Sequence, residues 1–505
     1  MLKIFDTAEI VLSELDNDTS YWLYNGLDAA VTLDIFNNLH PMTDASTRST
    51  YEFSKALQAP VLEMNLRGLA VNSRRKARVV REMKWKVAQL EAQLDRIITE
   101  GIGATACNWR SPTQLKGLLY DIMGLPVQKK RNASGVFAPT TDEGALEKLS
   151  VYYIAEPICN HLLTLRSLGK SLGFLATNID RDGRMRTQFN IAGTDTGRFA
   201  SSVTDYGTGT NLQNVTGALR SIFVADPGMK FCNLDLEQGD SRNVGAIAWN
   251  TLVEEHGPVF AGSYLDACES SDLHTLVCRM GNPSLPWGTE PDRQLADRPA
   301  YKHLSYRDLA KKLGHGSNYL GQPPTMAKHS RIPVSMAKSF QEQYFAAFPC
   351  IPAWHQSVFW NLENLGYLET LFGDRRFFFD RPREGATQRA AVAHSPQSMT
   401  AKEINTAILN LWRADRVQML VQVHDSILFQ YPEEMENEIV PWALETAKVH
   451  LELKKGRSFT VPTEAQVGWN WGYAAADNPD GLKKWKGGDP RRREETQFKL
   501  SLLDF

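Results

Sequence analysis

The chain has 505 residues, 42% of them hydrophobic, and a formal net charge of -2 from 56 basic and 58 acidic residues. These values predict a folded protein of several subdomains and exclude a disordered chain. The charge gives no support for nucleic-acid binding, which nevertheless needs only a local basic surface. The absence of a long apolar run, a secretion signal or paired cysteine motifs predicts a soluble intracellular protein with six reduced cysteines.

Residues 1–45 are expected to form a short first unit that ends in an amphipathic stretch over residues 28–39. A long helix is predicted from Ser73, a suitable N-cap, to Gly101. Apolar residues recur along it at intervals of three and four and predict one buried stripe: Val80, Met83, Val87, Leu90, Leu94 and Ile97. Residues 129–131 are expected in a basic polar loop, and residues 140–143 form a capping-box pattern before another helix.

The pattern becomes strand-like from about residue 184. Residues 229–235 predict a buried strand that ends in Asp235, and residues 417–431 predict a hairpin with Asp425 at its turn. Helical patterns over about 256–389 separate these two segments. We therefore expect a sheet that bears both carboxylates and is interrupted by a helical subdomain.

Between the two acidic strand ends, a helix is predicted to begin near Ser305. Four of its side chains recur every four residues, lie on one face and are about 6 Å apart along the axis: Arg307, Lys311, His315 and Tyr319. The two cations could hold a triphosphate, with the rings beyond them for a base or sugar. The alternative is an ordinary basic amphipathic helix.

Two converging carboxylates would repel each other unless divalent cations bridge them, and hard oxygen ligands favour Mg²⁺. Taken separately, Asp235 and Asp425 could each be a turn residue or a cap. Together with the cationic helix, they predict phosphoryl transfer assisted by two metal ions.

From about residue 50 to its C-terminus, the chain resembles family A DNA polymerases, the DNA polymerase I type. The strand ending in Asp235, residues 307–319 and residues 422–426 resemble motifs A, B and C of that family. Further segments resemble family motifs in the expected order: 63–68, 111–115, 139–143, 194–198, 211–214, 272–274, 366–376, 389 and 396–397.

The resemblance implies an α+β right-hand polymerase fold with an antiparallel-sheet palm, helical fingers and a helical thumb. It implies these domains: 1–45 as a remnant or C-terminal end of a 3′–5′ exonuclease-like domain, 46–183 as thumb, 184–255 as first part of the palm, 256–389 as fingers, and 390–505 as second part of the palm and C-terminus. Tyr24 and Asp28 resemble the third exonuclease motif, and Asp6 and Glu9 suggest the first. Some 45 residues are too few for a nuclease domain, so we expect no proofreading by this chain alone.

The implied activity is DNA-directed DNA synthesis, in which deoxynucleotides are added to a primer 3′-hydroxyl with two Mg²⁺ ions that Mn²⁺ could replace. The metal ligands would be Asp235, Asp425 and the Leu236 carbonyl, and Lys311 would also protonate the leaving group. The residues implied to bind the nucleotide are Arg307, Lys311, His315, Tyr319, His274, Asp240 and Gln238. The residues implied to bind DNA are Arg198, Asn211, Gln213, Gln397, Gln422, His424 and Arg389.

Three positions depart from the family pattern. His315 replaces Phe or Tyr, Ser426 replaces Glu, and Asp240 replaces the Glu that closes on the sugar 2′ position beside Tyr319. Because Asp is one methylene shorter than Glu, we expect a looser gate against ribonucleotides. These variants and the short chain favour a bacteriophage protein in the cytoplasm of a bacterial host.

The expected partners are primer–template DNA, deoxynucleoside triphosphates and a separate exonuclease chain or other replication protein, with no membrane. Two alternatives to a DNA polymerase stay open. A single-subunit RNA polymerase also uses an Asp-Ser pair in motif C. A non-catalytic primer–template binder could have kept the fold without the activity.

Overall fold

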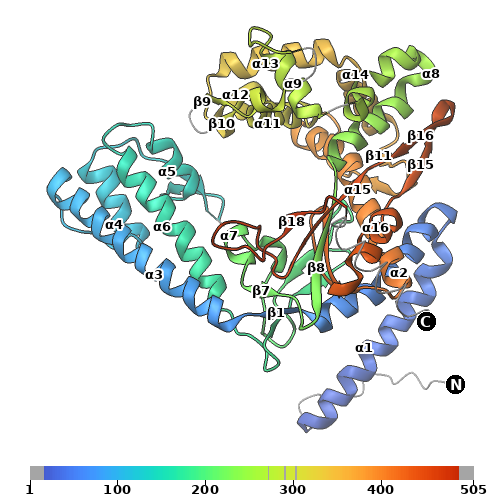
Figure 1. Cartoon of the computed structure of the whole chain (residues 1–505), viewed down its shortest axis with the longest axis horizontal. Coiled ribbons are helices and arrows are strands. Elements are labelled where there is room, and N and C mark those ends of the chain that lie inside the picture. Colours follow the sequence, from blue (N-terminus) through green and yellow to red (C-terminus); the bar gives the residue numbers. More distant parts are fainter. Residues whose placement is uncertain (1–15, 133, 271, 289–291, 302–303, 488–505) are drawn as a thin grey trace, which may run out of the picture.

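The computed structural model describes residues 16–132, 134–270, 272–288, 292–301 and 304–487. Asp6 and Glu9, which sequence comparison had suggested as part of a nuclease motif, lie outside these residues. A central sheet carries two projections, a helical arm over residues 73–175 and an upper helical lobe over residues 239–364 (Figure 1). This arrangement of antiparallel sheet and helical lobes confirms the expected α+β class.

The centre of the molecule is a five-stranded antiparallel sheet built around β8 (Met229–Leu236). Its strand order is β13-β14-β8-β17-β18, with β13 at Gln418–Val423, β14 at Ser426–Pro432, β17 at Thr463–Gly468 and β18 at Lys483–Lys484. Phe231, Cys232 and Leu234 of β8 are each at most 1% exposed, because the strand is covered on both faces. The predicted buried strand and hairpin are confirmed.

Three helices pack against this sheet: α2 (Ala45–Arg67), α15 (Gly385–Arg413) and α16 (Glu436–Thr446). Trp412 of α15 donates its indole N–H to Glu63 of α2 at 2.8 Å, which ties these helices together. Helix α2 therefore packs with the central unit, although its residues fall within the span 46–183 that we assigned to the thumb. The arm itself begins after it.

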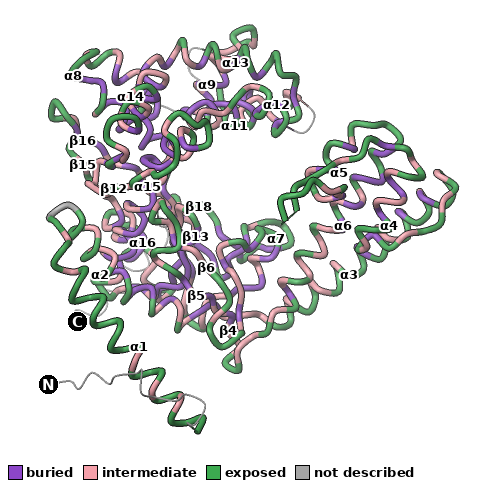
Figure 2. Tube along the Cα trace, turned by 180° about the vertical axis from the view of Figure 1, so that it is seen from behind, coloured by how far each residue is buried: buried purple, intermediate pink, exposed green. Residues whose placement is uncertain are grey.

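The arm consists of four helices, α3 (Ser73–Arg96), α4 (Pro112–Lys116), α5 (Glu143–Leu149) and α6 (Glu156–Leu175). It has a hydrophobic core of its own, in which Val87 and Leu94 of the predicted stripe are buried. Purple segments within the arm show this second core (Figure 2). The arm can therefore keep its shape independently of the central sheet.

The ends of α3 differ from the prediction. The N-cap is Asn72 and not Ser73, because the Asn72 side chain accepts the N–H of Arg75 at 2.9 Å. A π-helical turn at Ile97–Ile102 continues beyond Gly101 and ends at Gly103, whose φ of 75° is a left-handed conformation that glycine adopts without strain.

Two further local predictions are corrected in the arm. Lys129–Arg131 is not a loop but strand β2, paired with β3 (Phe137–Pro139). Helix α5 is capped by Asp142, which accepts the N–H of Ala145 at 2.9 Å, instead of by a capping box from Thr140. A carboxylate at the N-cap position competes well for the free N–H groups of the first turn.

Helix α1 (Asn17–Leu39) lies apart from the sheet (Figure 1). None of its residues is buried, so the amphipathic stretch expected over residues 28–39 packs no apolar face within the described residues. Tyr21, Trp22 and Tyr24 are each more than two-thirds exposed.

The upper lobe contains α8 (Gly239–Ser270), α9 (Leu273–Gly281), α10 (Arg293–Ala296), α11 (Tyr306–Asn318), α12 (Pro323–Ser330), α13 (Val334–Ala347) and α14 (Cys350–Asn364). A helical insertion between the two acidic strands is confirmed. It begins earlier than residue 256, because α8 starts directly after β8 and bends at Gly257, whose φ is 77°, and Pro258.

The remaining elements are short. They are β1 (Leu69–Val71), β4 (Arg184–Met185), β5 (Gln188–Asn190), β6 (Ala200–Ser202), α7 (Gly217–Arg220), β7 (Phe223–Val224), β9 (Pro299–Tyr301), β10 (Leu304–Ser305), β11 (Tyr367–Glu369), β12 (Arg375–Phe377), β15 (His450–Leu453) and β16 (Arg457–Thr460). All six cysteines are free, as expected. Among the described helices, none combines the length and apolarity needed to cross a membrane.

A buried polar contact joins α8 to α15. The Asn243 amide donates to Thr400 Oγ1 and to Glu403 Oε2, each at 3.0 Å. Burial raises the pKa of Glu403 from 4.5 to about 8. The folded protein therefore holds this proton between pH 4.5 and 8, whereas an unfolded chain releases it, so folding stability falls as pH rises through that range.

We expect Glu403→Gln to increase the free energy of unfolding at pH 8 by on the order of 1–3 kcal/mol and to flatten its decline between pH 5 and 8. Gln keeps an oxygen acceptor for Asn243 but carries no ionisable group. Urea unfolding at several pH values measures this, with the exposed Glu100→Gln as control. Equal pH profiles for wild type and Glu403→Gln would contradict the assignment.

Candidate active site

The pairing of β8 with β14 brings the two acidic strand ends together. Asp235 lies at the carboxyl end of β8, directly opposite Ser426. The N–H of Leu236 donates to the carbonyl of Asp425 at 3.2 Å, so the turn of the hairpin is fixed against the end of β8. The predicted convergence of Asp235 and Asp425 is therefore present in the fold.

A residue with a left-handed backbone conformation lies close to each carboxylate in the chain: one follows Asp235, and the other precedes Asp425. Gln238 and His424 both have φ of 57°, a conformation that costs a non-glycine residue about 1 kcal/mol or more. Such strain persists only where the surrounding structure fixes the backbone, and it is common at functional sites. Here it turns the chain sharply at both ends of the carboxylate pair.

Both residues are partly buried, and neither carboxylate forms an ion pair with a described residue. Burial, with the neighbouring charges of Asp425 and Glu464, raises the pKa of Asp235 to about 7, although Lys311 and Arg220 act in the opposite direction. Burial also raises the pKa of Asp425. Within the described residues, no side chain donates a hydrogen bond to either carboxylate. Two hard, uncompensated oxygen ligands fit a divalent cation well.

These two carboxylates would fill only part of a coordination shell. In the described part of the chain, no group of three or more His, Cys, Asp or Glu side chains is placed to hold a metal ion. The remaining ligands would therefore be carbonyl oxygens such as that of Leu236, waters or the oxygens of a bound phosphate.

A polar cavity of about 550 Å³ connects Asp235 to the cationic helix. It is lined by Asp235, Leu236, Glu237, Gln238, Arg242, Glu269, Ser270, Asp272, His274, Arg293, Arg307, Lys311, Glu464 and Lys484. Helix α11 begins as predicted, with Ser305 Oγ accepting the N–H of Asp308 at 3.0 Å. The cavity therefore unites acidic and basic groups that lie far apart in the sequence.

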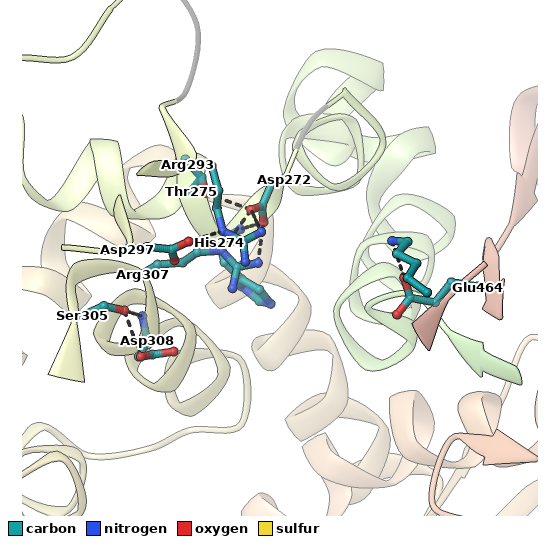
Figure 3. A network of polar contacts seen from close by, with 10 residues as sticks. Asp272, His274, Thr275, Arg293, Asp297, Ser305, Arg307, Asp308 and Glu464 are labelled. Carbon is teal, nitrogen blue, oxygen red and sulfur yellow. Dashed lines mark hydrogen bonds and ion pairs between the residues drawn. The ribbon is translucent and has the colours of Figure 1, made fainter. Parts of the chain in front are cut away.

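Asp272 organises the basic wall of this cavity (Figure 3). Its carboxylate accepts Nε and Nη2 of Arg307, each at 2.9 Å, and Nη1 of Arg293 at 3.2 Å. Burial alone would raise the pKa of Asp272, but the hydrogen bonds from Arg307 and Thr275 more than offset it and hold the pKa at about 2. The carboxylate is thus charged and fixes both arginines.

The other two predicted phosphate ligands, His274 and Lys311, differ in charge. Burial, followed by the charges of Arg307 and Lys311, lowers the pKa of His274 to about 4, so its imidazole is neutral at pH 7. A neutral imidazole can still donate one hydrogen bond. Lys311 is exposed to the cavity and forms no ion pair with any described residue.

The residues of the expected sugar gate meet at the base of the upper lobe. Asp240 accepts the Thr400 hydroxyl at 2.7 Å and forms an ion pair with Arg198 at 3.2 Å. The buried hydroxyl of Tyr319 has no hydrogen-bond partner among the described residues. The rings of His315 and Tyr319 pack edge to face, 4.7 Å apart. Asp240 thus bonds Arg198 and Thr400, and its charge also lies near enough to Tyr319 to add to the effect of burial in raising the pKa of that hydroxyl.

The residues predicted to contact DNA fall into two groups. Gln213 donates to Gln422 Oε1 at 2.8 Å, and Asn211 accepts the Ser201 hydroxyl at 2.7 Å. Gln422 is 1% exposed and its side-chain amide donates to the carbonyl of His424, so its side chain is held between Gln213 and His424. His424 and Arg389 are exposed, and Gln397 is half-buried.

The sequence interpretation missed four residues of this region. Arg293 and Lys484 add cations to the cavity, Glu464 lies directly opposite Asp235 on β17, and Thr400 holds Asp240. Each becomes recognisable only through strand register or helix packing. A glutamate two residues after a proline and a lysine near the C-terminus carry no local signal.

Comparisons with known proteins agree with this geometry. The family model described as DNA polymerase family A matches residues 77–255 and 297–473. The thermostable DNA polymerase I of Thermus aquaticus is 27% identical over 469 residues, covering 88% of this chain and 50% of that protein. DNA polymerase I of Deinococcus radiodurans is 26% identical over 465 residues, covering 88% and 44%. The chain spans about half the length of these relatives.

A solved structure shows the same fold. The POL domain of Pol1 from M. smegmatis, in a complex with DNA primer-template and dNTP, superposes with a TM-score of 0.64 and 25% identity. The match covers 82% of this chain and 69% of that one. The expected right-hand polymerase fold is confirmed.

We expect the affinity of the protein for a divalent cation to rise with pH by up to about tenfold per unit from pH 6 to 7 and to level off above that. The cation must displace a proton from Asp235, whose pKa is about 7. Titration with Mn²⁺ measures this. Asp235→Asn should bind more weakly and lose most of the pH dependence, whereas a flat profile for the wild type would contradict the prediction.

Proposed function

The chain belongs to DNA polymerase family A, and we propose that it is a DNA-directed DNA polymerase that adds deoxynucleotides to a primer 3′-hydroxyl. One observation carries this proposal: the cavity that joins Asp235 to Arg307 and Lys311. It offers oxygen ligands for metal ions at one end and phosphate ligands at the other. That pairing is what two-metal phosphoryl transfer requires.

In this proposal, Asp235, Asp425 and the Leu236 carbonyl would hold two Mg²⁺ ions, for which Mn²⁺ could substitute. The ions would supply activation of the primer hydroxyl and neutralisation of charge on the leaving pyrophosphate. Asp272 takes Nε and Nη2 of Arg307, and no described residue bonds Nη1, which is available for a phosphate oxygen. Neutral His274 donates a further hydrogen bond, and Lys311 binds a phosphate and protonates the leaving group.

The primer–template duplex would lie against the residues at the ends of the central sheet. Arg198, Gln213, Gln397 and His424 would approach its minor groove, where acceptors shared by all correct pairs report shape and not sequence. The upper lobe would serve as fingers, the arm as thumb and the central sheet as palm. The solved relative bound to primer-template and dNTP supports this assignment.

We further propose a role in bacteriophage replication, in the cytoplasm of a bacterial host. The variants His315, Asp240 and Ser426 support it, as departures from the pattern of cellular enzymes. Proofreading would come from a separate chain. Tyr24 and Asp28 lie exposed on the isolated helix α1, and no described metal-binding cluster accompanies them.

Primer extension tests the activity. We expect the wild-type protein with Mg²⁺ to extend a DNA primer with deoxynucleotides, and Asp425→Ala to reduce the rate by on the order of 10³-fold or more while primer–template binding persists. Asp34→Ala on α1 is the control and should behave as wild type. Extension only with ribonucleotides would favour an RNA polymerase. DNA binding without any extension would favour a non-catalytic binder.

The sugar gate gives a second test. Asp240 is engaged by Thr400 and Arg198, and the Tyr319 hydroxyl has no hydrogen-bond partner among the residues that the structure describes. We expect Asp240→Glu, whose longer side chain can reach further toward Tyr319, to increase discrimination against ribonucleotides by about tenfold in the ratio of kcat/KM values. Single-nucleotide incorporation with matched deoxy- and ribonucleotides measures it. Equal discrimination by both proteins would refute the looser gate.

A further inference from the structure

We propose that Lys484 is a further phosphate-binding residue of the nucleotide cavity, held in place by Glu464. The inference rests on the proposed function, since it concerns how the same cavity takes a nucleoside triphosphate. It adds a residue from a part of the chain that the family match, ending at residue 473, does not reach.

Strand β18 brings Lys484 to the face of the sheet that bears Asp235. Lys484 pairs in register with Gln466 of β17, and Lys483 pairs with Val467. Paired residues project on the same face and successive residues on opposite faces. Lys484 therefore shares the face of Gln466 and Glu464, whereas Lys483 projects from the other face.

Glu464 links this lysine to the metal-binding end of the cavity. It pairs directly with Asp235 on β8, so two carboxylates lie side by side across the strands. Like charges in this arrangement repel each other. Lys484 supplies the compensating charge, with its Nζ donating to Glu464 Oε2 at 2.7 Å.

Stability alone gives little reason for this ion pair. The side chain of Lys484 is 64% exposed and that of Glu464 is 28% exposed, and such surface pairs contribute about 0–1 kcal/mol. The position of the ammonium group is more informative, because Lys484 and Glu464 both line the cavity that contains Arg307 and Lys311.

Two walls of the cavity then carry cations. Figure 3 shows Glu464 across from the cluster of Asp272, Arg293 and Arg307. A lysine ammonium has three donors, and Glu464 occupies one of those of Lys484. The other donors are available to a phosphate oxygen, so a polyphosphate between the walls would be bound from both sides.

Steady-state primer extension across a range of deoxynucleotide concentrations tests the inference, using Lys484→Gln and the matched control Lys483→Gln. We expect Lys484→Gln to raise KM by about tenfold, the typical effect of losing one charge-assisted hydrogen bond, with a smaller change in kcat. Lys483→Gln should match the wild type. The inhibition constant of inorganic pyrophosphate should rise in parallel in Lys484→Gln.

The double variant Lys484→Gln/Glu464→Gln separates phosphate binding from mere neutralisation of Glu464. If the lysine acts only by neutralising Glu464, removing both charges should restore the wild-type KM and pyrophosphate inhibition. If it binds phosphate, the double variant should keep the raised KM and the weakened pyrophosphate inhibition of Lys484→Gln. Equal KM values for wild type, Lys483→Gln and Lys484→Gln would overturn the inference while leaving the polymerase intact.

Calorimetric titration of the protein with a deoxynucleoside triphosphate and Ca²⁺ decides the question without catalysis. Weaker binding by Lys484→Gln than by Lys483→Gln would support the inference even if no extension occurred, in which case only the proposed polymerase activity would fail. Indistinguishable binding by the two variants would reject it.

Discussion

The antiparallel register of β8 with β14 and β17 is the constraint on which the site depends. It sets Ser426 and Glu464 on either side of Asp235 and fixes the turn bearing Asp425 through the N–H of Leu236. Because side chains alternate along a strand, a slip of one residue would turn these groups to the opposite face. The buried apolar residues of β8 prevent that slip, so the hydrophobic core of the sheet also aligns the carboxylates.

The electrostatic cost of placing Asp235 beside other carboxylates is only partly offset by the cations around it. Asp235 retains a raised pKa because neighbouring acids and burial outweigh Lys311 and Arg220. Asp272 shows the opposite balance, since Arg307 bonds it directly and holds its pKa low. The two ends of the cavity therefore differ in the charge of the ligand that they can bind. The Asp272 end is already neutralised and presents fixed cations, whereas the Asp235 end still requires positive charge.

Much of this could be predicted from the sequence, and the limits have physical causes. Buried strands and amphipathic helices are local patterns, so β8, the β13–β14 hairpin and α11 with its Ser305 cap were predicted correctly. The ends of α3 were not, because Asn72 and Ser73 are both good caps and the sequence alone does not select between them. Glu464 and Lys484 escaped notice because their meaning lies in cross-strand register, which a single strand does not encode.

The hydrogen bonds of Thr400 join two parts of the proposed site. Its hydroxyl bonds Asp240, which also pairs with Arg198, and its oxygen accepts the amide of Asn243. Helices α8 and α15 are thereby connected at the point where the proposed sugar gate meets the proposed primer contact. If Arg198 is drawn toward DNA, Asp240 loses a partner and becomes freer to approach Tyr319. The contact of Asp240 with Tyr319 would then depend on whether the primer is bound. A longer side chain that reached Tyr319 directly would not need this dependence.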